Sequence, residues 1–159
     1  MKKLEIKITA LIVEDNKILL IKERNTDDQK YYWNLVKGSF DPREDNNLFD
    51  TVARECQEEI NTKVKIKKLI NVIYYRKGEK IRIQFSFLCH GHVQKAFLSN
   101  MSNQKLRNED IVEIKLFTKN QLKLIKKKEF MNERIYLTIK DFLKGNFKDL
   151  STIREIIEL

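Results

Sequence analysis

The chain has 159 residues, of which 42% are hydrophobic and 35% are charged, and it holds only four glycines and one proline. This length suits one domain with its own hydrophobic core, and the composition excludes collagen-like, linker-rich and low-complexity chains. The 32 basic and 23 acidic residues leave a net charge of +9, which favours anionic partners such as nucleotides, nucleic acid or a membrane surface without choosing among them.

Strand patterns fill the first part of the chain. Apolar and polar residues alternate over residues 4–12, which predicts a strand with one buried face. Asp15 and Asn16 predict a turn, and a second strand returns over residues 17–21. A short aromatic strand is expected at residues 31–36.

The apolar spacing then changes to a helical period over residues 48–60. Asn47 can cap the N-terminus of this helix, and Asn61 can end it in the left-handed conformation. We therefore predict one unbroken helix that begins at or after Asn47 and runs to about Ile60.

The rest of the chain is expected to contribute three strands and two helices. The turn between the first two strands is placed near Gly78, and the last helix stops at Gly145. A polar loop without a clear period is expected at residues 94–110. The predicted elements are strands at 65–75, 80–92 and 112–117 and helices at 120–126 and 135–143.

Three carboxylates lie together on the helix predicted at 48–60. At about 100° per residue, Glu58 and Glu59 fall within about 60° of Glu55, beside the apolar face. Like charges at these spacings repel one another, so a bound cation would explain the cluster, and carboxylate oxygens suit Mg²⁺ or Mn²⁺. A solvated acidic helix face is the alternative that this pattern alone leaves open.

The surrounding residues resemble the Nudix box, the signature of Nudix hydrolases. Gly38 and Glu44 have the family spacing, and Arg54-Glu55-Cys56-Gln57-Glu58-Glu59 matches the core of the box. Trp33 before the glycine and the strand and helix predicted from 112 onward resemble the flanking elements of the family. The resemblance covers about residues 4–143. It implies an α/β fold, the Nudix-type α/β/α sandwich with a mixed β-sheet, in a single Nudix hydrolase domain over residues 1–159.

Two departures from the box stand out. Nine residues rather than seven separate Glu44 from Arg54, which indicates two extra residues, placed around Asn46 and Asn47. Asn61 replaces the late glycine of the box, a mild change because asparagine tolerates positive φ. The extra residues make the position of Glu44 less certain than that of the helix carboxylates.

The resemblance assigns roles to individual residues. Glu55, Glu58 and Glu59 would hold the metal ion, with the carbonyl of Gly38 as a further ligand. Arg54 belongs to the catalytic set and would hold a box glutamate by a charge-assisted hydrogen bond. Glu44 would be either a ligand or a support behind the ligands.

The base and the substrate contacts are the less defined part of this site. Glu58 or Glu109 would accept the proton of the attacking water, and Glu109 is also a candidate metal ligand. Lys37 would meet a phosphate, with a solvated lysine as the alternative. Trp33 would stack on a base, with core packing as the alternative. His90 and His92 share a strand face, but a metal role for them is not favoured.

The activity implied by the resemblance is Mg²⁺- or Mn²⁺-dependent hydrolysis of a nucleoside diphosphate linked to another moiety. Nucleoside triphosphates are weakly favoured, ahead of ADP-ribose and dinucleoside polyphosphates. A non-catalytic Nudix-fold module that binds nucleotides for regulation is the alternative. The expected partner is a small-molecule nucleotide; nucleic acid is not favoured, and a homodimer stays open.

Cysteine usage and hydropathy indicate the compartment. Cys56 and Cys89 form neither a disulfide framework nor a CxxC zinc motif, and free thiols favour a reducing environment. The apolar run at residues 8–13 is too short for a signal peptide, and the sequence has no apolar stretch of about 18 residues. We expect a cytoplasmic protein without a membrane segment.

Overall fold

A computed structural model describes residues 3–93, 96, 104 and 110–159. The predicted site residue Glu109 lies outside the described residues. Within these ranges, no helix is long and apolar enough to cross a membrane. The elements in chain order are β1 (Lys3–Glu14), β2 (Lys17–Arg24), β3 (Tyr31–Asn34), β4 (Val36–Ser39), α1 (Leu48–Ile60), β5 (Val64–Lys77), β6 (Lys80–Gly91), β7 (Ile111–Thr118), α3 (Lys119–Leu124), η2 (Lys127–Glu129), α4 (Glu133–Lys144) and η3 (Leu150–Thr152).

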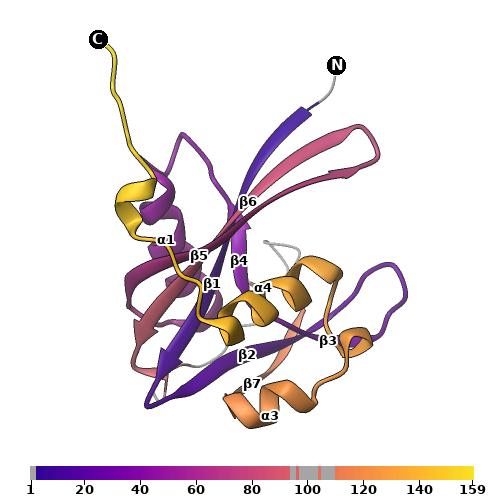
Figure 1. Cartoon of the computed structure of the whole chain (residues 1–159). Coiled ribbons are helices and arrows are strands. Elements are labelled where there is room, and N and C mark those ends of the chain that lie inside the picture. The colour runs from indigo at the N-terminus through magenta and orange to yellow at the C-terminus, as the bar shows by residue number, and fades with distance from the viewer. Residues whose placement is uncertain (1–2, 94–95, 97–103, 105–109) are drawn as a thin grey trace.

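The strands form one mixed seven-stranded sheet around β1 (Figure 1). β1 pairs in parallel with β6 over most of its length and antiparallel with β4. It pairs with β2 only beside the turn, after which β2 diverges and pairs with β3 and β7. The predicted hairpin of β5 and β6 is confirmed, as is the mixed α/β fold class.

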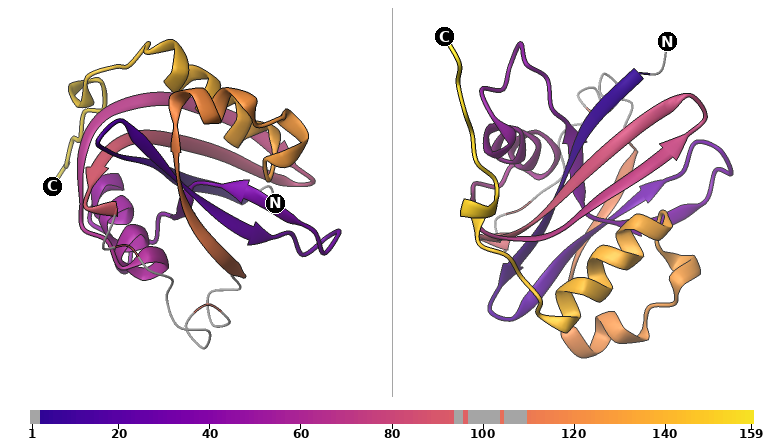
Figure 2. Two further views of the ribbon diagram at one scale, coloured as in Figure 1. Left: turned by 90° about the horizontal axis from the view of Figure 1, so that it is seen from below. Right: turned by 45° about the horizontal axis from the view of Figure 1, so that its top comes forward.

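Helices cover both faces of this sheet, as Figure 2 shows from two sides. Ile8, Ala10 and Ile12 of β1 belong to the core cluster that contains α1. Leu11 belongs to a second cluster, formed with α3 and α4 on the other face. The prediction of a half-buried first strand is therefore wrong for its middle, because both faces of residues 8–12 are covered.

The helix that carries the candidate site has the predicted bounds. The side chain of Asn47 accepts hydrogen bonds from the backbone amides of Phe49 and Asp50, at 2.9 and 3.1 Å. Asn61 ends the helix in the left-handed conformation, with φ of 50°. α1 is continuous between these caps, so no bulge rotates its carboxylates relative to one another.

The strand predicted at residues 31–36 is two strands in the structure. β3 pairs with β2, whereas β4 crosses to pair with β1. The Asn34 side chain lies where the chain passes from β3 to β4. It accepts a hydrogen bond from the backbone amide of Leu35 and donates one to the carboxylate of Glu23. The break carries no glycine or proline signal, and its effect is to place Gly38 of β4 beside both Ile8 and α1.

Candidate active site

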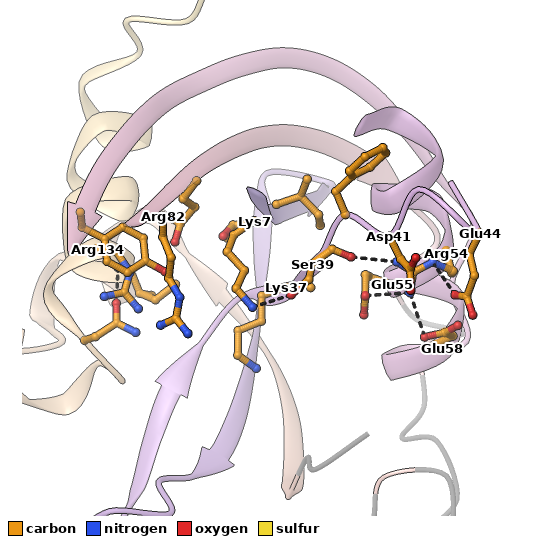
Figure 3. Close-up of a pocket in the computed structure, with 18 of the residues that line it drawn as sticks. Lys7, Lys37, Ser39, Asp41, Glu44, Arg54, Glu55, Glu58, Arg82 and Arg134 are labelled. Atoms are coloured by element: carbon orange, nitrogen blue, oxygen red, sulfur yellow. Dashed lines mark hydrogen bonds and ion pairs between the residues drawn. The ribbon is translucent and has the colours of Figure 1, made fainter. Parts of the chain in front are cut away.

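A cavity of about 900 Å³ opens between the sheet, α1 and the start of α4. Figure 3 shows that its charged side chains gather in two groups, one mainly acidic around Arg54 and one basic. Glu55 and Glu58 of α1 lie at one end, and Arg82 of β6 and Arg134 of α4 lie at the other. This arrangement gives a single cavity an acidic end and a basic end.

Glu55 is held closely against the backbone of Gly38. A Cβ atom at residue 38 would lie 1.9 Å from Cδ of Glu55, so only a glycine allows this approach. The side chain of Glu55 is 8% exposed, and Arg54 Nη1 donates to its Oε1 at 2.9 Å. The structure therefore brings together Gly38, Arg54 and Glu55, three of the predicted site residues.

The other two helix carboxylates lie in different environments. Glu58 lines the cavity with 34% of its side chain exposed, and its Oε2 lies 3.4 Å from Arg54 Nη1. Glu59 is fully buried and is not among the described residues that line the cavity. The helical rotation explains the difference, because Glu59 lies on the side of Glu55 that turns toward the apolar face.

Asp45 is the main partner of Arg54, and the sequence analysis missed it. Arg54 Nε and Nη2 donate to Oδ1 and Oδ2 of Asp45, each at 2.9 Å. The Asp45 side chain is 1% exposed, whereas that of Glu44 is 58% exposed and approaches Arg54 only to 3.5 Å. Bonding to Arg54 lowers the pKa of Asp45, and bonding to Asp45 raises the pKa of Arg54. The one signal for Asp45 was its place directly after Glu44.

Lys37 lies between the two ends of the cavity. Its ammonium group contacts both carboxylate oxygens of Glu23, at 2.9 and 3.0 Å. Glu23 is buried at a register shift in β2, and it also accepts a hydrogen bond from Asn34 at 2.7 Å. Lys37 therefore lines the cavity in a fixed position, as a predicted phosphate contact would require.

The basic end contains residues that the sequence analysis did not select. Lys7 of β1, Arg82 of β6 and Arg134 of α4 line it together with Tyr75 of β5. Arg82 Nε donates to Glu5 Oε2 at 2.7 Å, and this contact lowers the pKa of Glu5 to about 2. The four cavity residues come from four elements, so no local pattern joins them.

Trp33 does not join this site. It packs edge-on against Phe117, with ring centroids 4.9 Å apart, and it contacts the second core cluster. It is not among the described residues that line the cavity, so the structure favours the packing alternative. Cys56 is buried in the first cluster, and burial raises the pKa of its thiol.

The donor chemistry of the acidic end fits a hard cation. Glu55 and Glu58 offer carboxylate oxygens at the cavity surface, and the missing Cβ of Gly38 lets the Glu55 carboxylate lie against the backbone of β4. In the part of the chain that the structure describes, no three His, Cys, Asp or Glu side chains form a compact metal-binding group. The contact of Arg54 with Glu55 and Glu58 shows that this end accommodates positive charge.

Comparison with known proteins gives consistent results. The sequence matches a family described as NUDIX domain over residues 3–138. A NUDIX hydrolase from Nitrosomonas europaea superposes with a TM-score of 0.74 at 16% identity, covering 97% of this chain and 98% of that one. A MutT protein from Methanosarcina mazei Go1 gives 0.68 at 21% identity, covering 91% and 96%. A UDP-X diphosphatase gives 0.62 at 20% identity, covering 94% and 67%. The search of curated proteins gave no significant match.

Proposed function

The chain belongs to the NUDIX domain family, a membership that supports a pyrophosphohydrolase, and we propose that it hydrolyses nucleoside diphosphates linked to another moiety with the help of Mg²⁺ or Mn²⁺. One observation carries the proposal: Glu55, fixed by Arg54 against Gly38, and Glu58 face the same cavity as Lys37. Carboxylates for a cation and an ammonium group for a phosphate thus share one cavity.

Glu55 and Glu58 would hold the cation in this proposal, together with the Gly38 carbonyl. A bound Mg²⁺ or Mn²⁺ would neutralise charge on the pyrophosphate and make water a better nucleophile. Glu59 is buried behind them, and we assign it to the metal site on the family resemblance.

The protein's own groups would position and deprotonate the reactants. Glu58 is the more exposed of the two cavity carboxylates on α1, which supports it as the acceptor of the proton from the attacking water. Arg54 acts by orienting Glu55, since its guanidinium is itself fixed by Asp45. Lys37 would contact a phosphate oxygen of the substrate.

Nucleoside triphosphates, ADP-ribose and dinucleoside polyphosphates are the candidate substrates. Structural relatives include a protein described as an ADP compounds hydrolase and one described as a UDP-X diphosphatase, both of which fit a diphosphate-linked substrate. We propose the cytoplasm as the compartment, because both cysteines are free and buried.

A nucleotide panel tests this function. Purified protein should convert at least one candidate to a nucleoside monophosphate and a second phosphorylated product, lose this activity in EDTA and regain it with Mg²⁺ or Mn²⁺. Glu58→Gln should lower kcat at least about 100-fold, equivalent to about 3 kcal/mol of barrier, while remaining folded. Glu113→Gln, an exposed carboxylate on β7, is the matched control and should retain activity. Turnover that survives chelation would refute the mechanism.

A further inference from the structure

The basic end of the cavity has more positive charge than its protein partners balance. Lys7, Arg82 and Arg134 line it from three elements. Among the described residues, Glu5 is the one carboxylate within ion-pair distance of this group, 2.7 Å from Arg82 and 3.9 Å from Lys7. Arg82 and Lys7 thus share one carboxylate, which Lys80 also contacts at 3.3 Å, and no carboxylate of the described residues lies within ion-pair distance of Arg134.

Arg134 is the least compensated of the three. Its guanidinium carbon lies 3.8 Å from the centroid of the Tyr75 ring, and its Nε atom is buried without a hydrogen-bond partner among the described residues. Burial also lowers the pKa of Arg134. Stacking fixes the plane of the guanidinium without using its N–H donors, which leaves them available for an anion.

The position of these residues indicates which anion they would meet. Figure 3 shows Arg82 and Arg134 across the cavity from Glu55 and Glu58, with Lys7 and Lys37 between the two groups. A substrate whose pyrophosphate lies at the acidic end would extend its remaining part toward the arginines. Paired arginines match the geometry of a phosphate, which accepts two parallel N–H bonds.

We propose that Arg134, Arg82 and Lys7 form a subsite for a second phosphate, carried by the substrate at a distance from the pyrophosphate that is cleaved. This inference rests on the proposed function and narrows it to substrates that carry an additional phosphate outside the pyrophosphate that is cleaved. Such a phosphate would supply the counter-charge that Arg134 lacks among the described residues. Substrates that lack the phosphate would leave this charge uncompensated in a partly buried position.

Pairs of compounds that differ by one phosphate test the subsite. Suitable pairs are ADP-ribose with its 2′-phosphate, and dephospho-coenzyme A with coenzyme A. Dissociation constants are measured by calorimetry on Glu58→Gln protein, so that turnover does not interfere, and kcat/KM is measured on the wild type. In at least one pair we expect the phosphorylated compound to be favoured about tenfold or more in both measurements.

Arg134→Gln should lower this preference to about threefold or less, because the phosphate loses its paired donors. Arg76→Gln is the matched control, since Arg76 contacts the ring of Tyr74 but lies outside the cavity, and its preference should equal that of the wild type. Arg134→Lys keeps the charge without the paired donors and should give an intermediate preference. It also serves as the test if Arg134→Gln does not fold.

The experiment separates failure of the subsite from failure of the proposed function. Equal affinity for both members of every pair, or a preference that persists in Arg134→Gln, would overturn the subsite. Inorganic phosphate at the concentration of the nucleotide should leave the preference unchanged; if it abolishes the preference, the subsite binds the free anion and the proposal is wrong. Absence of hydrolysis for every compound of these pairs and of the nucleotide panel would refute the proposed function, while the dissociation constants would still test the subsite.

Discussion

Two neighbouring carboxylates in the loop before α1 occupy very different environments. Asp45 is buried and makes two hydrogen bonds of 2.9 Å to Arg54, and Thr51 Oγ1 donates to it at 3.0 Å. Glu44 is exposed and lies 3.5 Å from the same guanidinium. The buried residue, rather than the one that matches the box spacing, fixes Arg54 and through it Glu55.

Asp45→Asn should therefore destabilise the protein by about 2 kcal/mol, because it removes the buried charged acceptor of a partly buried arginine. Glu44→Gln, the matched control one residue away, should change the free energy of unfolding by less than about 0.5 kcal/mol. Urea unfolding at neutral pH measures both values. Equal effects of the two substitutions would show that Glu44 shares the structural role.

Gly38 has no room for a side chain because the Glu55 carboxylate lies against it. Gly38→Ala would place a methyl group where the Glu55 carboxylate now lies, so Glu55 must move away from its position. We expect kcat to fall at least about tenfold, since catalysis depends on this geometry.

Gly78→Ala is the control for this substitution. Gly78 lies in the β5–β6 turn with φ of +60° and open space around it, so alanine should cost about 1 kcal/mol of stability without changing activity. Comparing kcat and thermal unfolding for both variants separates displacement of Glu55 from general destabilisation. Wild-type turnover in Gly38→Ala would mean that the position of Glu55 is unimportant.

At the scale of elements, the parallel pair of β1 and β6 carries a pH-dependent contact. Glu5 lies directly opposite Arg82 in the register, and Arg82 lowers the pKa of Glu5 from 4.5 to about 2. A lowered carboxyl pKa stabilises the folded state above the pKa of the unfolded chain, and this stabilisation is lost as the pH falls through the folded value. The contact therefore acts fully above about pH 4.5 and disappears toward pH 2.

Glu5→Gln should lower the free energy of unfolding by about 1 kcal/mol at pH 7, a value reduced for partial exposure to solvent. The difference from the wild type should shrink between pH 4.5 and 2, when the wild-type carboxyl also becomes neutral. Urea titrations at several pH values test this. Glu79→Gln in the adjoining turn should show no such dependence, and a constant difference for Glu5→Gln would contradict the assigned cause.

For the whole molecule, metal binding should increase the free energy of unfolding. A ligand that binds only the folded state raises its stability by about 2.7 kcal/mol at 100 times the dissociation constant. Saturating Mg²⁺ or Mn²⁺ should therefore raise the Tm by several degrees, and Glu55→Gln should reduce the shift. KCl at matched ionic strength controls for charge screening. A shift of the same size in Glu55→Gln would place the cation elsewhere.

The local features of this protein can be predicted from its sequence alone. The bounds of α1 follow from apolar spacing and from two local signals. Asn47 accepts hydrogen bonds from the first free backbone amides of the helix, and Asn61 ends the helix in the left-handed conformation. The end of α4 at Gly145 follows from the same kind of signal, since glycine accepts φ of 76° there. The box residues Gly38, Arg54, Glu55 and Glu58 were also recognisable, and the structure places them together.

The surroundings of those residues depend on contacts between distant parts of the chain. Strand pairing is set by contacts between residues distant in sequence. The residues at the break between β3 and β4 therefore do not predict it. The burial of Asp45 and of Trp33 likewise depends on the elements packed against them. The basic end of the cavity is the extreme case: Lys7, Arg82 and Arg134 lie on separate elements, and only the parallel pairing of β1 with β6 and the packing of α4 on the sheet bring their charges together.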